Sequence, residues 1–144
     1  MTASQLCIDK IKAFEGLSLR AYRCPAGVLT IGYGNTSMAK RYPTITREQA
    51  DLFLKADIAN VEKALARLNL PQLTQYQWDA IVDFCFNLGV GNFAKSTLLR
   101  KIRINTKDLT IPFEFKRWVY SNGKKLAGLE KRRAWESERW RGKG

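Results

Sequence analysis

Three observations predict a mainly helical α+β fold for this chain of 144 residues. Strand and turn residues are concentrated in residues 17–36. From about residue 46 onward, apolar residues recur at three- and four-residue spacing, which indicates helices. One helix, about 46–68, is long enough to join a small β-containing lobe, about 16–45, to a larger helical lobe. We expect the helical lobe to comprise about 71–144 plus an N-terminal helix, 4–15, within a single domain 1–144.

Residues 4–15, SQLCIDKIKAFE, predict the first helix. Its apolar stripe consists of Cys7, Ile8, Ile11 and Phe14. Ser4 suits the N-cap because its hydroxyl can accept a hydrogen bond from a free backbone N–H, and Gly16 suits the helix end. Glu15 falls at the rim of the same face, so we expect its carboxyl to be partly buried.

The following segment predicts a β-hairpin. Cys24-Pro25-Ala26-Gly27 has proline and glycine where a type I turn prefers them. Residues 28–31, VLTI, are β-prone. Because side chains alternate along a strand, Thr30 is expected to face out of the core if Leu29 and Ile31 face into it.

The rest of the chain is predicted to be helical. Thr46 and Gln49 form a capping box at the start of the long helix. Its expected apolar stripe consists of Leu52, Leu54, Ile58, Val61 and Leu65. Four further helices are predicted over residues 74–88, 93–104, 113–120 and 129–140.

The composition limits the possible functions. The chain has 25 Lys and Arg against 13 Asp and Glu, a net charge of +12, which favours anionic partners such as nucleic acid, a membrane surface or a bacterial wall. It has no histidine, which excludes Ser–His–Asp and Cys–His hydrolases and histidine-ligated zinc. Cys7, Cys24 and Cys85 lack paired spacing, so we expect reduced thiols, no metal and no cofactor.

Glu15 is a candidate general acid. It lies at the predicted C-terminal end of a helix, where the helix dipole is negative, and beside apolar residues. Both effects disfavour the carboxylate anion, so the side chain is suited to give a proton to a leaving-group oxygen. The commoner alternative for such a residue is a surface glutamate at a helix end.

The spacing of three residues resembles a known catalytic signature. Eight residues separate Glu15 from Cys24, and five separate Cys24 from Thr30. This pattern resembles that of phage-type lysozymes, glycoside hydrolase family 24. The surrounding FEG and TIGYG, FNLGVGNFAKSTLLRKI at 86–102 and GLEKRRAWESE at 128–138 are also similar to that family, in order along nearly the whole chain.

The resemblance implies a lysozyme-like, two-lobed fold and an endolysin. The implied reaction is hydrolysis of the β-1,4 bond between N-acetylmuramic acid and N-acetylglucosamine in peptidoglycan, for lysis of the host. Glu15 would be the general acid. Cys24, where many members have aspartate, would either activate a water together with Thr30 and invert the sugar, or attack directly and retain its configuration. The first is favoured because sulfur is hard to protonate and expel.

Five residues are candidates for substrate contacts. Tyr33 and Phe93 could stack on sugar faces, although core packing is the commoner role of such aromatics. Asn92 and Ser96 could bind acetamido groups, with helix capping as the alternative. Asn35 stands where the family often has histidine, and it can hydrogen-bond a carboxylate or backbone but cannot carry a proton charge.

The last predicted helix contributes two further expectations. One of its arginines, Arg132 or Arg133, is expected to support the cleft, and salt bridges to Glu136 account for part of the charge pattern. The basic segment 131–143 could also make weak contact with an anionic membrane or disrupt one directly.

Two other functions remain open at this stage. A lytic transglycosylase also uses one glutamate but needs no residues to position water, so Cys24 and Thr30 favour the hydrolase. A basic nucleic-acid-binding module would use the positive charge, but no base-reading motif is present, and we expect no nucleic-acid partner.

The expected location follows from the resemblance and from the absence of an apolar run of roughly 20 residues. Asp9, Lys10 and Lys12 interrupt the N-terminal segment, so no export signal is recognised. We expect a monomer made in the host cytoplasm that reaches the wall from the periplasmic side after a holin opens the inner membrane.

Overall fold

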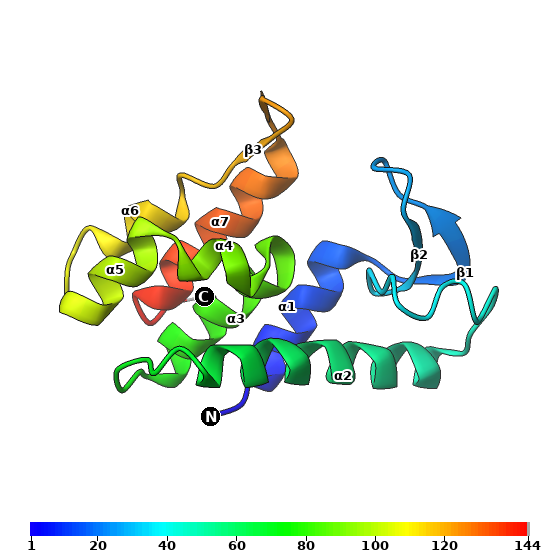
Figure 1. Cartoon of the computed structure of the whole chain (residues 1–144), viewed down its shortest axis with the longest axis horizontal. Helices are drawn as coiled ribbons and strands as arrows, with labels where there is room; N and C mark the ends of the chain where they lie inside the picture. Colours follow the sequence, from blue (N-terminus) through cyan, green and yellow to red (C-terminus); the bar gives the residue numbers. More distant parts are fainter. Residues whose placement is uncertain (144) are drawn as a thin grey trace.

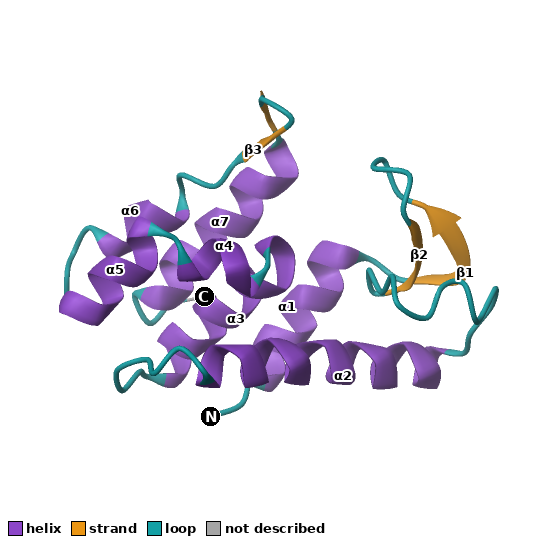
Figure 2. Cartoon of the chain, in the orientation of Figure 1, coloured by secondary structure: helices purple, strands orange, loops and turns teal. Residues whose placement is uncertain are grey.

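A helix of 20 residues, α2 (Arg47–Ala66), extends between a β-hairpin at one end and a group of helices at the other (Figure 1). The computed structural model describes residues 1–143, and Gly144, the last residue of the expected helical lobe, lies outside them. Most of the described chain is helical, with two small antiparallel hairpins (Figure 2). The predicted fold class, mainly helical α+β, is therefore confirmed. Among the described residues, no helix combines the length and apolar character needed to span a membrane.

The first helix and hairpin form as their sequence predicts. α1 (Gln5–Glu15) begins after Ser4, whose hydroxyl accepts a hydrogen bond from the Cys7 N–H at 3.2 Å. β1 (Ser18–Arg23) pairs antiparallel with β2 (Leu29–Gly32), so that Tyr22 lies opposite Thr30. An irregularity in the pairing between Ser18 and Tyr22 bends the strand.

The long helix has the predicted start but a narrower apolar face. Thr46 and Gln49 form both hydrogen bonds of the capping box. Leu54, Ile58 and Leu65 are buried, whereas Leu52 is 64% exposed, so its predicted place in the stripe is wrong. Two residues along a helix correspond to about 200° of rotation, which turns Leu52 away from the face of Leu54.

The predicted third helix is confirmed as α3 (Gln75–Leu88), capped by Thr74. The next prediction, 93–104, is divided in the structure into α4 (Val90–Ala94) and α5 (Thr97–Ile104). The division falls at Ser96, which is the N-cap of α5 and accepts a hydrogen bond from the Leu99 N–H.

The predicted helix 113–120 is also wrong in part. α6 (Ile111–Phe115) ends early, and β3 (Tyr120–Ser121) then pairs with β4 (Lys124–Lys125). Asn122 and Gly123 join the two strands with φ of 50° and 78°, the left-handed conformation that a tight hairpin requires. The last helix is α7 (Ala127–Trp140).

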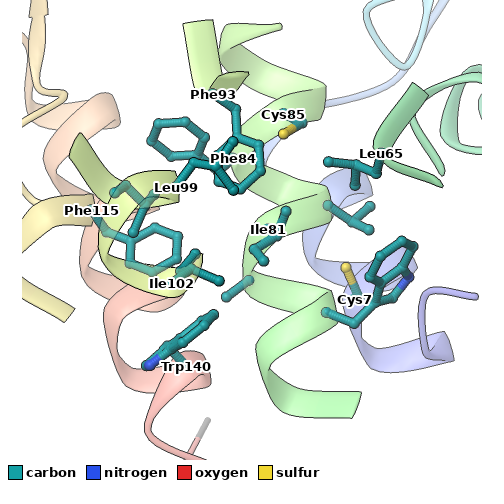
Figure 3. Close-up of a cluster of buried hydrophobic side chains, with 14 of the residues drawn as sticks. Cys7, Leu65, Ile81, Phe84, Cys85, Phe93, Leu99, Ile102, Phe115 and Trp140 are labelled. Carbon is teal, nitrogen blue, oxygen red and sulfur yellow. The ribbon is translucent and has the colours of Figure 1, made fainter. Parts of the chain in front are cut away.

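Two groups of buried apolar side chains lie along the molecule. The larger belongs to the helical region, where α3 packs against α7 (Figure 3). At its centre the Phe84 ring meets the rings of Phe93 and Phe115 edge-on, with centroids 5.9 and 5.7 Å away. The smaller group lies at the β1–β2 hairpin and consists of Ile31, Ala39, Ile45 and Ala50. Partly buried Tyr33 packs against both groups.

Candidate active site

Glu15 lies at the last position of α1 and lines a pocket of about 330 Å³. Its side chain is partly buried, 19% exposed, as predicted. The other pocket residues come from the segment after β2, from α2 and from α3: Gly34, Asn35, Thr36, Ser37, Asp57, Val61, Phe86 and Asn87. The Glu15 carboxylate lies so close to Gly34 (φ 75°) that a Cβ there would overlap its Oε1 atom.

Of the two arginines considered as supports for the cleft, Arg132 is the one that contacts Glu15. Its Nη1 lies 2.5 Å from Glu15 Oε2, and its guanidinium carbon lies 5.1 Å from the centre of the Phe14 ring. Arg133 instead contacts Glu136 and the side chain of Asn87, at 2.8 Å to each. The expected bridge to Glu136 is therefore made by Arg133.

Cys24 and Thr30 lie together at the turn end of the β1–β2 hairpin. Hydrogen bonds from the backbone of Val28 and Ala26, and from the Thr30 side chain, lower the pKa of the Cys24 thiol below its ordinary value of 9.0, although some desolvation opposes them. The Thr30 hydroxyl also lies 2.9 Å from the Val28 carbonyl oxygen. Since a hydroxyl has one proton, Thr30 donates either to that carbonyl or to a Cys24 thiolate.

Thr30 is buried although the alternation of β2 predicts that its side chain faces out of the core. Ile31 belongs to the smaller apolar group and Leu29 packs against it, as that prediction requires. Tyr22 from β1 lies directly opposite Thr30, and the turn that contains Cys24 adjoins it, so both faces of β2 are covered at this point. Cys24 and Thr30 contact each other, whereas Glu15 makes its contacts with Arg132 and Gly34.

Asn35 is buried at the edge of the Glu15 pocket. Its amide donates to Asp57 Oδ2 at 2.9 Å, and its carbonyl accepts from the Met38 N–H at 2.9 Å. The expectation that Asn35 hydrogen-bonds a carboxylate and backbone is thus confirmed. Burial raises the pKa of Asp57, and the hydrogen bond from Asn35 opposes that rise.

The other substrate-contact candidates have different surroundings. Phe93 is fully buried in the larger core, so its predicted stacking on a sugar is wrong. Ser96 is the N-cap of α5, and its hydroxyl donates a hydrogen bond to the Phe93 carbonyl oxygen at 2.7 Å. The observed role of Ser96 is therefore helix capping, the alternative to substrate binding. Asn92 is exposed and, with Ser96, lines a separate pocket of about 390 Å³. Tyr33 has Lys12 Nζ 5.5 Å from its ring centre.

The two other cysteines are free and buried, and burial is the main cause that raises the pKa of both the Cys7 and the Cys85 thiol. Sequence reasoning missed Asp57, Asp83 and Asn87. The signal for Asp83 was present: Asp79 and Asp83 are four residues apart in the apolar stretch WDAIVDF, on the face that packs in the core.

Solved structures with this architecture include a muramidase domain and phage endolysins. The muramidase domain of SpmX from Asticaccaulis excentricus superimposes with a TM-score of 0.84 at 36% identity, over 96% of this chain and 97% of that one. An endolysin from Escherichia coli O157:H7 phage FAHEc1 gives 0.85 at 32% identity, over 97% and 93%. The fold and these likenesses define the class: the chain is a glycoside hydrolase of the muramidase type.

The sequence comparisons identify the family. Residues 12–136 match the phage lysozyme family model, and the chain belongs to that family. It is 44% identical to an endolysin of Acyrthosiphon pisum secondary endosymbiont phage 1, over 92% of this chain and 93% of that protein. A SAR-endolysin of Escherichia phage Mu is 36% identical over 90% of this chain and 75% of its own length. The chain spans 54% of the endolysin of Bacillus phage PZA, at 38% identity.

Proposed function

We propose that this endolysin hydrolyses the β-1,4 bond between N-acetylmuramic acid and N-acetylglucosamine of peptidoglycan, with Glu15 as the general acid. The observation that carries the proposal is the setting of Glu15. Its carboxyl faces a pocket and is held by Arg132, which is itself 6% exposed. A carboxyl fixed in this way can deliver its proton to the bridging oxygen in one orientation.

Cys24 and Thr30 would hold and activate the attacking water. The water attacks the anomeric carbon, the Cys24 thiolate accepts one of its protons, and Glu15 gives its own proton to the departing sugar oxygen. The anomeric configuration is inverted. The lowered pKa of the Cys24 thiol supports this assignment because it increases the thiolate fraction at neutral pH.

The biological role we infer is lysis of the bacterial host. The relatives named endolysin support it, as does the net charge of +12, because bacterial envelopes are polyanionic. We propose that the chain acts as a monomer, reaching the wall through the periplasm after a holin opens the inner membrane. The alternative of membrane disruption by residues 131–143 loses support because Arg132, Arg133 and Arg139 are buried against carboxylates.

Clearing of chloroform-treated Gram-negative cells tests the roles of the three residues. Glu15→Gln should reduce the initial rate by roughly 100-fold or more, the usual contribution of a general acid. Cys24→Ser and Thr30→Ala should reduce the rate while leaving the circular dichroism spectrum unchanged. Glu48→Gln, on an exposed part of α2, is the matched control and should keep full activity. Unchanged clearing by Glu15→Gln would remove Glu15 from the mechanism.

The products identify the reaction. Mass spectrometry of the released muropeptides should show reducing ends, because water is added across the bond. Anhydro ends would identify a lytic transglycosylase instead. A salt-sensitive gel shift with DNA, together with full clearing by Glu15→Gln, would favour the nucleic-acid-binding alternative.

A further inference from the structure

Arg132 lies between two carboxylates, only one of which lines the pocket. Nη1 contacts Glu15 Oε2 at 2.5 Å. On its other side, Nη2 lies 2.9 Å from Asp83 Oδ1, and Nε lies 3.1 Å from each Asp83 oxygen. Asp83 is fully buried on α3 and does not reach the pocket surface. The arginine therefore has a buried carboxylate partner in addition to Glu15.

This arrangement addresses a conflict in the proposed mechanism. A general acid must carry a proton, but an adjacent guanidinium favours the carboxylate anion. If Glu15 were the sole counterion of Arg132, the buried arginine would strongly oppose protonation of Glu15, since a buried charge without a partner is costly. With Asp83 present, Arg132 keeps a partner whether Glu15 is charged or neutral.

We propose that Asp83 is a positioning and charge-balancing residue for Glu15: it fixes Arg132 and neutralises it, so that the arginine can orient Glu15 without withholding its proton. This rests on the proposed role of Glu15 as the acid. The pKa of Arg132 agrees with the geometry. Burial acts to lower it, but the charge of Asp83, followed by that of Glu15, raises it above its ordinary value.

Other charged and titratable groups surround this cluster. From α7, Arg133 and Glu136 form a buried ion pair, and burial, aided by a hydrogen bond with Asp83, raises the pKa of Glu136. Cys7 on α1 and Cys85 on α3 are buried thiols whose raised pKa values keep them neutral near pH 7. Asp57 on α2 lines the Glu15 pocket. Asp83 is the carboxylate in contact with Arg132 on the side away from Glu15.

Titration of the Glu15 carboxyl carbon by NMR tests the proposal directly. The protein is labelled with ¹³C at the glutamate side-chain carboxyls, and Glu15→Gln assigns the Glu15 signal. In Asp83→Asn, the midpoint of the Glu15 titration should fall by about one pH unit or more, because removal of one negative charge leaves Arg132 with Glu15 as its main counterion. A midpoint unchanged in the folded variant would overturn the proposal.

Asp79→Asn is the matched control. Asp79 is also fully buried on α3 and also pairs with an arginine of α7, Arg139, at 2.7 Å. Its loss should reduce stability in the same way while leaving the Glu15 midpoint unchanged, so a fall of equal size in both variants would also contradict a specific role for Asp83. If Asp83→Asn does not fold, Asp83→Ser, a smaller neutral residue, serves the same test.

Kinetics provide a second measurement. At pH 7, Asp83→Asn should lower kcat by roughly tenfold, in proportion to the fall in the proton affinity of Glu15. KM should be nearly unchanged. A raised KM at constant kcat would indicate a role in binding substrate and would contradict the proposal. The NMR titration does not depend on activity, so it remains decisive about Asp83 even if Glu15→Gln shows that Glu15 is not the acid.

Discussion

At the scale of single residues, Cys24 differs from the two other cysteines in exposure and in the hydrogen bonds around its sulfur. Cys7 and Cys85 are buried, whereas Cys24 is partly exposed at the hairpin. The same residue type is therefore a small apolar side chain at two positions and a candidate base at the third.

Alkylation with iodoacetamide should report this difference. The rate of modification of Cys24 should rise with pH to a midpoint below 9.0, and lytic activity should be lost in parallel. Thr30→Ala should move the midpoint upward, because it removes one hydrogen bond to the thiolate. Cys24→Ser is the control and should take up no label without denaturant. Full activity after complete alkylation would exclude Cys24 from the mechanism.

Gly34 is the second residue with a specific test. In Gly34→Ala the new methyl group must displace the Glu15 carboxyl, and a misplacement of about 1 Å can cost roughly 100-fold in rate. Gly123→Ala is a matched control, because Gly123 also has a positive φ, 78°, but no atoms within 4 Å of its added Cβ. Both variants should lose about 1–2 kcal/mol of stability. Activity should fall in Gly34→Ala alone, and equal activities would disprove the positional argument.

The limits of sequence reasoning are clear at this scale. The positions of Glu15 and its neighbours at a helix end could be predicted from local spacing and capping. The partner of Glu15 could not, because Arg132 is 117 residues away and two adjacent arginines were equally plausible. Phe93 shows the same limit, since its burial depends on Phe84 and Phe115 in other helices.

At the scale of elements, α7 is a basic helix with much of its charge used inside the protein. Arg132 and Arg139 pair with Asp83 and Asp79, which lie one turn apart on α3. These pairs align α3 with α7, and α7 in turn carries the arginine that contacts Glu15. Part of the positive charge of this basic segment is therefore paired with buried carboxylates and does not contribute to the charge of the protein surface.

The hydrogen bond between Asp57 on α2 and Asn35, in the segment after β2, should affect how the free energy of unfolding depends on pH. Burial raises the pKa of Asp57 in the folded state above its value in the unfolded state. Protonation of Asp57 therefore stabilises the fold below the unfolded-state pKa, and this stabilisation is lost as the pH rises through the folded-state pKa. Asp57→Asn removes this dependence. In urea unfolding, the stability of the variant relative to the parent should therefore increase between pH 3 and pH 7.

The matched control for that measurement is Asp51→Asn. Asp51 is also on α2 but is more exposed and pairs with Lys12 at 3.1 Å. Its substitution should give no relative gain on going to pH 7, because it removes a favourable ion pair. A parent that gains more stability than Asp57→Asn over the same range would contradict the argument from burial.

The second hairpin shows which elements could be predicted. Long helices with capping boxes, α2 and α3, were predicted closely because their signals are local and strong. The β3–β4 hairpin has strands of two residues each, too short for a periodic pattern. Its Asn122-Gly123 pair is nevertheless a strong turn signal, and it would have indicated a hairpin between the predicted helix 113–120 and the last helix.

At the scale of the whole molecule, the pocket forms where segments from distant parts of the sequence meet. α1 contributes Glu15, α2 contributes Asp57, and α3 contributes Asn87. Tyr33 contacts both apolar groups, so the hairpin end and the helical end are joined beside the pocket as well as through α2. The fold class could be predicted from the order of its elements, whereas this convergence required the structure.

The ion pair of Glu15 and Arg132 also bears on how the protein reaches its working form. It closes a loop of 117 residues, and such a closure carries a larger entropic cost than any contact within one helix. Helices that form locally leave Glu15 without its arginine, because Glu15 is on α1 and Arg132 is on α7. A chain that has gained only its secondary structure therefore lacks the setting of Glu15 on which the proposed activity depends.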